Sequence, residues 1–163
     1  MSKWKFLIFL FLVCSMPQAG FAQNADSIVK PDPQFGFSWS QKRKDKSGIK
    51  AAIIREKGVN GDREMAYAMH LAGFDVKDVH MTDLISGRED LSDVNFIAFV
   101  GGFSNSDVLG SAKGWAGAFL YNEKAKAALD AFYARENTAS LGICNGCQLM
   151  GELGLLYPEH NEH

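Results

Sequence analysis

Residues 138–148 read Thr-Ala-Ser-Leu-Gly-Ile-Cys-Asn-Gly-Cys-Gln, which predicts a buried strand that turns sharply into a helix. The small and aliphatic residues before Cys144 are typical of such a strand. Gly142 and Gly146 lie two residues on either side of Cys144, the spacing of a nucleophile elbow, where side chains have no room. The helix predicted over 148–153 directs its N-terminal N–H groups at the Cys144 sulfur, which favours the thiolate. A buried structural cysteine is the alternative, but it needs no flanking glycines.

The overall composition indicates one globular domain or part of a larger one. The chain has 163 residues, and 47% of them are hydrophobic, which suits a single core. Lysine and arginine number 17, aspartate and glutamate 19, and the net charge is −2. No charge excess therefore indicates binding to nucleic acid or to an anionic membrane. The 3 cysteines, at positions 14, 144 and 147, do not form a disulfide framework.

The N-terminal segment differs from the rest of the chain. Lys3 and Lys5 precede an apolar run over 6–14, and small residues stand at −3 and −1 of a cut before Gln23. This layout over 1–22 is that of a secretory signal peptide, with an N-terminal core helix as the alternative. The run is shorter than the roughly 20 residues that span a bilayer, so we expect no stable membrane span. Residues 23–47 are polar and predict a linker, and 48–163 carry the folded domain.

Strand and helix patterns alternate along the folded part. Strands are predicted over 49–54, 74–80 and 94–100, in addition to the strand before Cys144. Asp62 is predicted to cap a helix over 63–71 that ends at Gly73, and Asn122 to cap a second helix. This alternation favours an α/β fold with a mostly parallel sheet flanked by helices. In such sheets ligands bind beyond the carboxyl ends of the strands, where the glycine-bearing loops 55–61 and 101–110 would meet the Cys144 turn.

Three segments together resemble one enzyme family. Residues 142–148 are similar to the G-x-C-x-G-x-Q signature of class I, triad-type glutamine amidotransferases. Arg-Glu-Lys-Gly-Val-Asn-Gly at 55–61 and Gly-Gly-Phe-Ser-Asn-Ser-Asp-Val-Leu-Gly at 101–110 extend the resemblance to the glutaminase domain of the phosphoribosylformylglycinamidine synthase family. The resemblance implies a flavodoxin-like class I glutaminase fold that is incomplete at its C-terminus. It also implies a cytoplasmic location, which the signal-like leader contradicts.

The resemblance implies that glutamine is the substrate and is hydrolysed through a thioester on Cys144. It makes the backbone N–H groups of Gly102 and Asn145 the oxyanion donors. The substrate-binding residues that it implies are Gly101, Phe103 and Gln148, although Gln148 as a polar residue on the helix surface is an equal alternative. Ammonia would pass to a synthetase portion of the same enzyme family, which uses ATP and magnesium to aminate formylglycinamide ribonucleotide in purine biosynthesis. No cofactor or metal is expected in this segment.

The histidine and glutamate of the catalytic triad have no counterpart at the family's positions. In the family both follow the elbow helix at some distance, whereas His160 and His163 stand here in a short polar tail. His70 falls on the first predicted helix and His80 at the end of the second predicted strand. None of these four matches the family's histidine motif, so we expect a truncated domain with impaired glutamine turnover.

Cys144 and Cys147 are also compatible with other classes of protein. Cys144 and Cys147 form a C-x-x-C at a strand-to-helix junction, as in thioredoxin-like redox sites. A secreted redox protein would fit the leader, but thioredoxin motifs stand near the start of the fold, and Gly142 and Gly146 have no role there. A zinc site would need a second pair of ligands at suitable spacing. A non-catalytic fragment, whose sheet lacks covering elements, is the third alternative.

Overall fold

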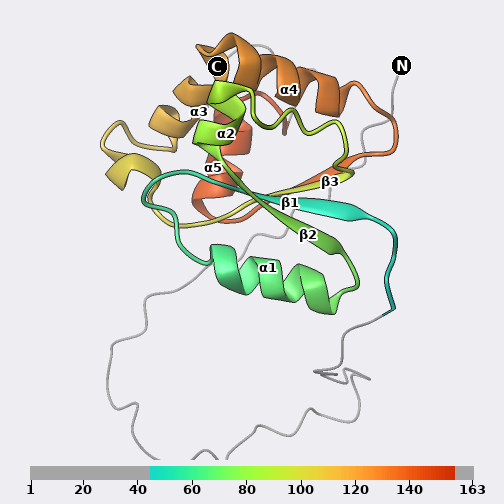
Figure 1. Ribbon diagram of the computed structural model, residues 1–163. Coiled ribbons are helices and arrows are strands. Elements are labelled where there is room, and N and C mark those ends of the chain that lie inside the picture. The colour runs from blue at the N-terminus through green and yellow to red at the C-terminus, as the bar shows by residue number, and fades with distance from the viewer. Residues whose placement is uncertain (1–44, 157–163) are drawn as a thin grey trace, which may run out of the picture.

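The computed structural model describes residues 45–156, in which a sheet lies between helices on both of its faces (Figure 1). The predicted leader, most of the predicted linker and the histidines at 160 and 163 lie outside the described residues. The strands are β1 (Lys50–Arg55), β2 (Asp75–His80), β3 (Phe96–Phe99) and β4 (Ala139–Gly142). The helices are α1 (Asp62–Leu71), α2 (Met81–Ser86), α3 (Lys113–Leu120), α4 (Glu123–Tyr133) and α5 (Asn145–Glu152), with a 3₁₀ segment, η2 (Ser104–Asp107).

The sheet is parallel throughout, in the order β2-β1-β3-β4. This confirms the predicted α/β fold class. After β1 the chain passes to α1 on one face, whereas after β3 it passes to α3 and α4 on the opposite face (Figure 1). Because the neighbouring strands β1 and β3 send the chain to opposite faces, their carboxyl ends form a topological switch point, the place where ligands bind in open α/β sheets. The fold thus brings loops 55–61 and 101–110 to one place.

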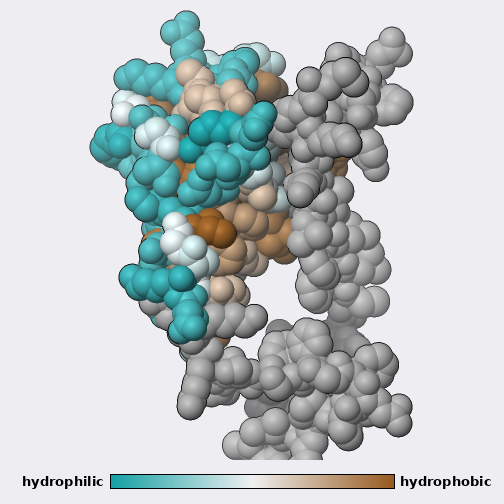
Figure 2. Space-filling view, turned by 90° about the vertical axis from the view of Figure 1, so that its right-hand side faces the viewer, coloured by the Kyte–Doolittle hydropathy of each residue, from teal (hydrophilic) through white to brown (hydrophobic). Residues whose placement is uncertain are grey.

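Two apolar layers pack against the sheet. The larger lies between the sheet and α2–α5 and contains the buried rings of Phe99, Trp115 and Phe119. Phe99 meets each of the other two edge to face, with centroids 6.1 Å apart. The smaller layer, which includes Ile53 and Met69, faces α1. Figure 2, turned by 90° from Figure 1, has apolar residues gathered at the height of the sheet and mostly hydrophilic residues above them. No helix within 45–156 has the length and apolar character needed to cross a membrane.

The C-terminal end of α1 agrees with the sequence prediction, and its N-terminal end does not. At its C-terminal end, Gly73 adopts φ 97°, and its N–H donates to the His70 carbonyl at 3.0 Å. Phe74 N–H donates to the Met69 carbonyl at 3.1 Å, which completes a Schellman motif and confirms the predicted stop. At the N-terminal end the prediction of an Asp62 cap was wrong. The cap position is occupied by a glycine at φ 80° without a side-chain hydrogen bond, and Asp62 is the first helical residue.

Two helices in the structure had no counterpart in the sequence prediction. α2 is only six residues long, too short to display a helical period, and it begins with a capping box formed by His80 and Asp83. α3 contains Gly114 and Gly117, which lower helix propensity, and it is held by its buried aromatic residues. The Asn122 cap is confirmed, because its side chain accepts from the Ala125 N–H at 3.0 Å. α5 begins three residues before the predicted 148.

Candidate active site

Cys144 occupies the sharp turn between β4 and α5. Its backbone has φ 54° and ψ −115°, a combination that residues with a Cβ atom rarely adopt. Hydrogen bonds of the first helical turn hold it there: Cys147 N–H donates to the Cys144 carbonyl at 2.9 Å, and Gln148 N–H donates to the same oxygen at 3.1 Å. The Cys144 side chain is exposed, whereas that of Cys147 is half-buried. The chain therefore presents one strained, accessible thiol at the carboxyl edge of the sheet.

The glycines around Cys144 let α5 lie directly on the sheet. A Cβ atom on Gly146 would stand 2.2 Å from the Phe99 carbonyl oxygen, and one on Gly142 would stand 2.6 Å from Met150 Sδ and 2.8 Å from the Gly146 carbonyl oxygen. Such separations are shorter than any van der Waals contact, so a side chain at either position would push α5 away from β3 and β4. Close packing of helix on strand is the steric reason for the Gly-x-Cys-x-Gly spacing.

Loop 101–110 lies beside the Cys144 turn. A Cβ atom on Gly101 would stand 3.1 Å from Cys144 Cβ and 3.9 Å from its Sγ, so the glycine leaves free space next to the sulfur. Gly102 has φ 93°, and a Cβ atom there would meet the Asn60 nitrogen at 2.4 Å. The Asn60 N–H donates to the Gly101 carbonyl at 2.9 Å. The two loops and the turn are therefore joined around one point, as the topology predicts.

The remaining candidate residues lie around this point in different environments. Within residues 45–156, neither the Gly102 N–H nor the Asn145 N–H donates a hydrogen bond to a protein acceptor. Phe103 is 65% exposed. Gln148 is exposed on the first turn of α5, where its Oε1 accepts from Asn145 Nδ2 at 3.0 Å. Two backbone donors without a partner among the described residues and one exposed amide thus belong to the segments that meet at Cys144.

A buried polar contact that the sequence prediction missed joins loop 101–110 to α5. Ser104 is 1% exposed and Asn145 is 0% exposed. Asn145 Oδ1 accepts from the Ser104 hydroxyl at 2.7 Å and from the Ser104 N–H at 3.2 Å. The sequence prediction assigned a role only to the backbone N–H of Asn145. Ser104 could have been noticed only because it stands two residues after Gly102, in the loop that begins with the glycine pair.

The structure does not bring a described histidine to Cys144. His80 caps α2, where its Nδ1 accepts from the Thr82 N–H at 3.2 Å. β2 and β4 are separated by two strands, which is about 14 Å at the usual strand spacing. His70 lies in the last turn of α1, and α1 runs back toward the amino ends of the strands (Figure 1). The described residues therefore place no imidazole within hydrogen-bonding reach of the sulfur.

An ion pair in this region holds two neighbouring strands together and does not contact the Cys144 thiol. The Arg55 guanidinium, at the end of β1, donates to both carboxylate oxygens of Asp78 on β2, at 2.7 Å and 2.9 Å. These hydrogen bonds hold the pKa of Asp78 below its usual value and raise the pKa of Arg55. Because β2 lies on the side of β1 away from β3, this pair anchors loop 55–61 from the side opposite Cys144.

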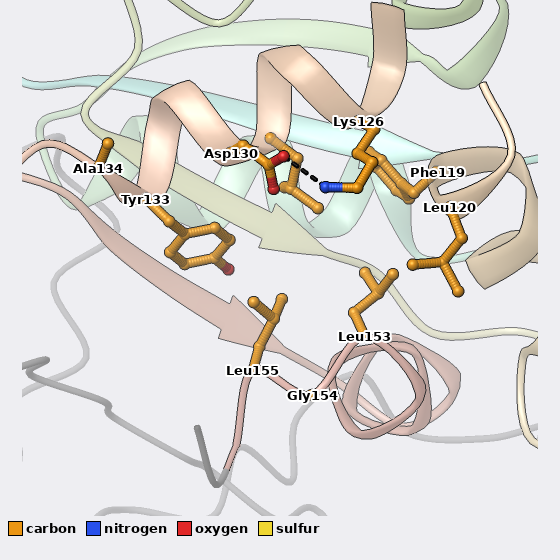
Figure 3. Close-up of a pocket in the computed structure, with 10 residues that line it drawn as sticks. Phe119, Leu120, Lys126, Asp130, Tyr133, Ala134, Leu153, Gly154 and Leu155 are labelled. Carbon is orange, nitrogen blue, oxygen red and sulfur yellow. Dashed lines mark hydrogen bonds and ion pairs between the residues drawn. The ribbon is translucent and has the colours of Figure 1, made fainter. Parts of the chain in front are cut away.

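A cavity lies elsewhere in the molecule. Its volume is about 410 Å³, and its lining comes from α3, α4 and the end of α5 (Figure 3). Tyr133 from α4 faces Leu153 and Leu155 across it (Figure 3). Lys126 and Asp130 form an ion pair of 2.6 Å among the lining residues. Cys144 stands at the other end of α5. Within 45–156, no cluster of three or more histidine, cysteine or acidic side chains is arranged to hold a metal ion.

Comparison with known proteins identifies relatives over most of the chain. Residues 48–163 match the family model for the CobB/CobQ-like glutamine amidotransferase domain. Phosphoribosylformylglycinamidine synthase of Homo sapiens is 57% identical over 113 residues, which is 69% of this chain and 8% of that protein. The enzyme of the same name from Dictyostelium discoideum is 56% identical over 106 residues, or 64% of this chain and 8% of that protein. The chain therefore spans about 8% of the length of these relatives.

A solved structure shares the fold. One chain of PurLQS from Thermotoga maritima aligns with a TM-score of 0.54 at 28% sequence identity. The alignment covers 66% of this chain and 45% of that chain. The likeness confirms the predicted type of fold and indicates that the solved chain contains a substantial part without a counterpart here.

Proposed function

Because the chain belongs to the family of CobB/CobQ-like glutamine amidotransferase domains, we propose that it is the glutaminase portion of a phosphoribosylformylglycinamidine synthase. The high identity to the human and Dictyostelium enzymes supports this assignment. In this role it would release ammonia from glutamine in the cytoplasm. A synthetase portion, its partner, would use ATP and magnesium to aminate formylglycinamide ribonucleotide in purine biosynthesis. Family membership favours this function over the thioredoxin-like alternative.

The proposed reaction begins at the Cys144 sulfur. The sulfur attacks the side-chain amide carbon of glutamine, the carbon–nitrogen bond breaks, and the nitrogen leaves as ammonia after it takes up a proton. Water then hydrolyses the thioester, which yields glutamate and restores the thiol. The negative oxygen of each tetrahedral intermediate would be stabilised by the N–H groups of Gly102 and Asn145. Gly101, Phe103 and Gln148 would contact the substrate.

One observation carries the proposal: the exposed Cys144 is held in a strained turn, beside a glycine whose missing side chain leaves the cysteine uncrowded. Strained, non-glycine backbone of this kind is concentrated at functional sites. The two neighbouring backbone N–H groups have no protein acceptor within 45–156, so they are available to an oxyanion. The proposal assigns no general base within these residues, since neither described histidine lies near the sulfur.

Labelling with a chloroketone analogue of glutamine tests the proposal without requiring turnover. We expect the analogue to alkylate Cys144 at least about tenfold faster than Cys147, because only Cys144 has adjacent oxyanion donors. Free glutamine should protect Cys144, and glutamate should protect it less. Peptide mass spectrometry measures both rates, and a Cys144→Ala variant is the control for labelling elsewhere. Equal labelling of the two thiols, or no protection by glutamine, would contradict the proposed function.

A further inference from the structure

We infer that Ser104 and the side chain of Asn145 form a positioning pair, which sets the distance between the two backbone donors of the oxyanion site. This inference rests on the proposed function and assigns a role to two side chains that the proposed chemistry leaves unused. Ser104 is the first residue of η2, and Asn145 is the first residue of α5. The pair connects segments that are 41 residues apart in the sequence.

The contact is buried and doubly hydrogen-bonded. Asn145 Oδ1 receives the Ser104 hydroxyl at 2.7 Å and the Ser104 backbone N–H at 3.2 Å. Both residues are at most 1% exposed, so water does not compete for these hydrogen bonds. Among the described residues, they are the hydrogen bonds that join loop 101–110 directly to α5.

The chemistry of the partners fixes the orientation of the Asn145 amide. A backbone N–H can only donate, so the atom that faces Ser104 must be the amide oxygen. The Nδ2 group then points to Gln148, whose Oε1 accepts from it at 3.0 Å. Gln148 must in turn present its NH₂ group away from Asn145. The pair therefore sets the polarity of the exposed Gln148 amide as well as the position of the loop.

The position of the pair links it to both proposed donors. The Gly102 N–H lies two residues before Ser104, and the second donor is the backbone N–H of Asn145 itself. Oxyanion stabilisation depends on donors held about 2.7–3.1 Å from the developing charge, and a displacement of a few tenths of an ångström weakens it. Loss of a hydrogen bond between the two segments would therefore weaken the oxyanion site while leaving the Cys144 sulfur in place.

The sheet itself does not depend on this pair. The turn before Cys144 is held to β3 by the Ile143 N–H, which donates to the Phe99 carbonyl at 3.0 Å. The close contacts of Gly142 and Gly146 hold α5 on the sheet. In a Ser104→Ala variant the Ser104 backbone bond to Asn145 remains, so the buried amide keeps a partner and the fold is retained.

Two alkylating reagents separate positioning from exposure. The chloroketone analogue of glutamine loses chloride to the sulfur while its ketone oxygen accepts from the two backbone donors. Iodoacetamide loses iodide to the sulfur and, lacking the glutamine frame, is not held against those donors. With the full-length chain, we expect Ser104→Ala to lower the limiting rate of chloroketone labelling at Cys144 about fivefold, the value for one hydrogen bond. Asn145→Leu, which removes both bonds, should lower it further. In Ser104→Ala, which leaves the hydrogen bond from Asn145 to Gln148 in place, the half-saturating concentration and the iodoacetamide rate should each change less than twofold.

Ser106→Ala is the matched control, because Ser106 is an exposed serine two residues away in the same segment. It should leave both labelling rates unchanged, and Ser104→Thr, which keeps the hydroxyl, should recover part of the loss. Unchanged chloroketone labelling in Ser104→Ala would overturn the inference, as would an equal drop with both reagents. If Asn145→Leu fails to fold by circular dichroism, Ser104→Ala alone decides. Failure of the wild-type chain to label selectively would instead overturn the proposed function.

Discussion

The two ends of α5 differ in what the structure has built around them. At the N-terminal end, Cys144 is strained, two glycines bring helix and strand into backbone contact, and buried hydrogen bonds tie on a neighbouring loop. At the C-terminal end, Leu153 and Leu155 line a cavity of about 410 Å³, and Leu153 has φ −88°. This cavity lies at the end without the strained turn. Backbone constraint, rather than cavity volume, marks the end at which we propose chemistry.

The largest expected effect tests how tightly the N-terminal end is packed. Gly146→Ala would place a Cβ atom 2.2 Å from the Phe99 carbonyl oxygen, so α5 must move off the sheet. We expect the free energy of unfolding to fall by about 3 kcal/mol or more. Urea denaturation followed by circular dichroism measures the change.

Gly151→Ala is the control at the opposite end of the same helix. A Cβ atom there would meet its nearest neighbour, Leu156 Cδ1, at 3.9 Å, which is ordinary contact. Removal of a helical glycine should raise the free energy of unfolding by about 0.5–1 kcal/mol. If the two variants lost similar stability, the contrast between the two ends of α5 would be wrong.

The strain at Cys144 predicts that its removal stabilises the chain. Cys144→Gly relieves a backbone conformation that costs about 1–3 kcal/mol in residues with a Cβ atom, less about 0.5–1 kcal/mol for the greater flexibility of unfolded glycine. We expect the free energy of unfolding to rise by up to about 2.5 kcal/mol in Cys144→Gly but not in Cys144→Ala. Thermal and urea unfolding of the two variants measure the difference. A Cys144→Gly variant less stable than Cys144→Ala would show that the turn is not strained.

At the cavity end, Tyr133 predicts a loss of stability at high pH. Burial raises the pKa of Tyr133 to about 12, whereas unfolded tyrosine titrates near 10. Its contribution to stability is therefore complete below pH ~10 and falls as the pH rises toward the folded value. The stability of wild type relative to Tyr133→Phe should drop by about 1 kcal/mol between pH 9 and pH 11. At neutral pH the variant should lose about 1 kcal/mol with the Tyr133 hydroxyl bond to Ser140. A constant difference across this pH range would mean that the ring is hydrated.

The smallest effect concerns the ion pair among the cavity residues. Lys126 and Asp130 are paired at 2.6 Å, but their side chains are 53% and 63% exposed. Exposed pairs at this helical spacing contribute about 0.3–0.5 kcal/mol, and alanine has a higher helix propensity than lysine. Lys126→Ala should therefore change the midpoint of urea unfolding very little. A loss above about 1 kcal/mol would indicate that this charge supports the cavity.

The sequence predicted the fold well where hydrophobic patterns were long and where glycine or a capping residue marked their ends. The strands, the stop at Gly73 and the cap at Asn122 follow from local chemistry, and the alternation of elements implies the parallel sheet. Short or glycine-containing helices were missed, because α2 is shorter than two turns and α3 is stabilised by buried Trp115 rather than by propensity. α5 begins earlier than predicted, since the helix accommodates Gly146 by packing it against a strand.

The candidate site was predicted in part. Glycine spacing located Cys144 and the two loops around it, because close approach of backbones leaves a mark in the sequence. The contact between Ser104 and Asn145 leaves no such mark, since it joins residues far apart in the chain through ordinary polar side chains. The chemical roles of all the site residues stay predictions: Cys144 as nucleophile, Gly102 and Asn145 as oxyanion donors, and Gly101, Phe103 and Gln148 as substrate contacts.

The parallel sheet also makes the turn at Cys144 dependent on pairing between distant strands. Parallel strands are joined by a long crossover connection, usually a helix. Phe96 of β3 therefore pairs with Ala139 of β4, which lies far along the chain. β4 is the last of the described strands in the chain, and the bend that distorts Cys144 follows directly after it. The elbow geometry of this sulfur therefore depends on the pairing of two strands that are far apart in the sequence, and a chain in which β3 and β4 are unpaired would carry it as an ordinary thiol.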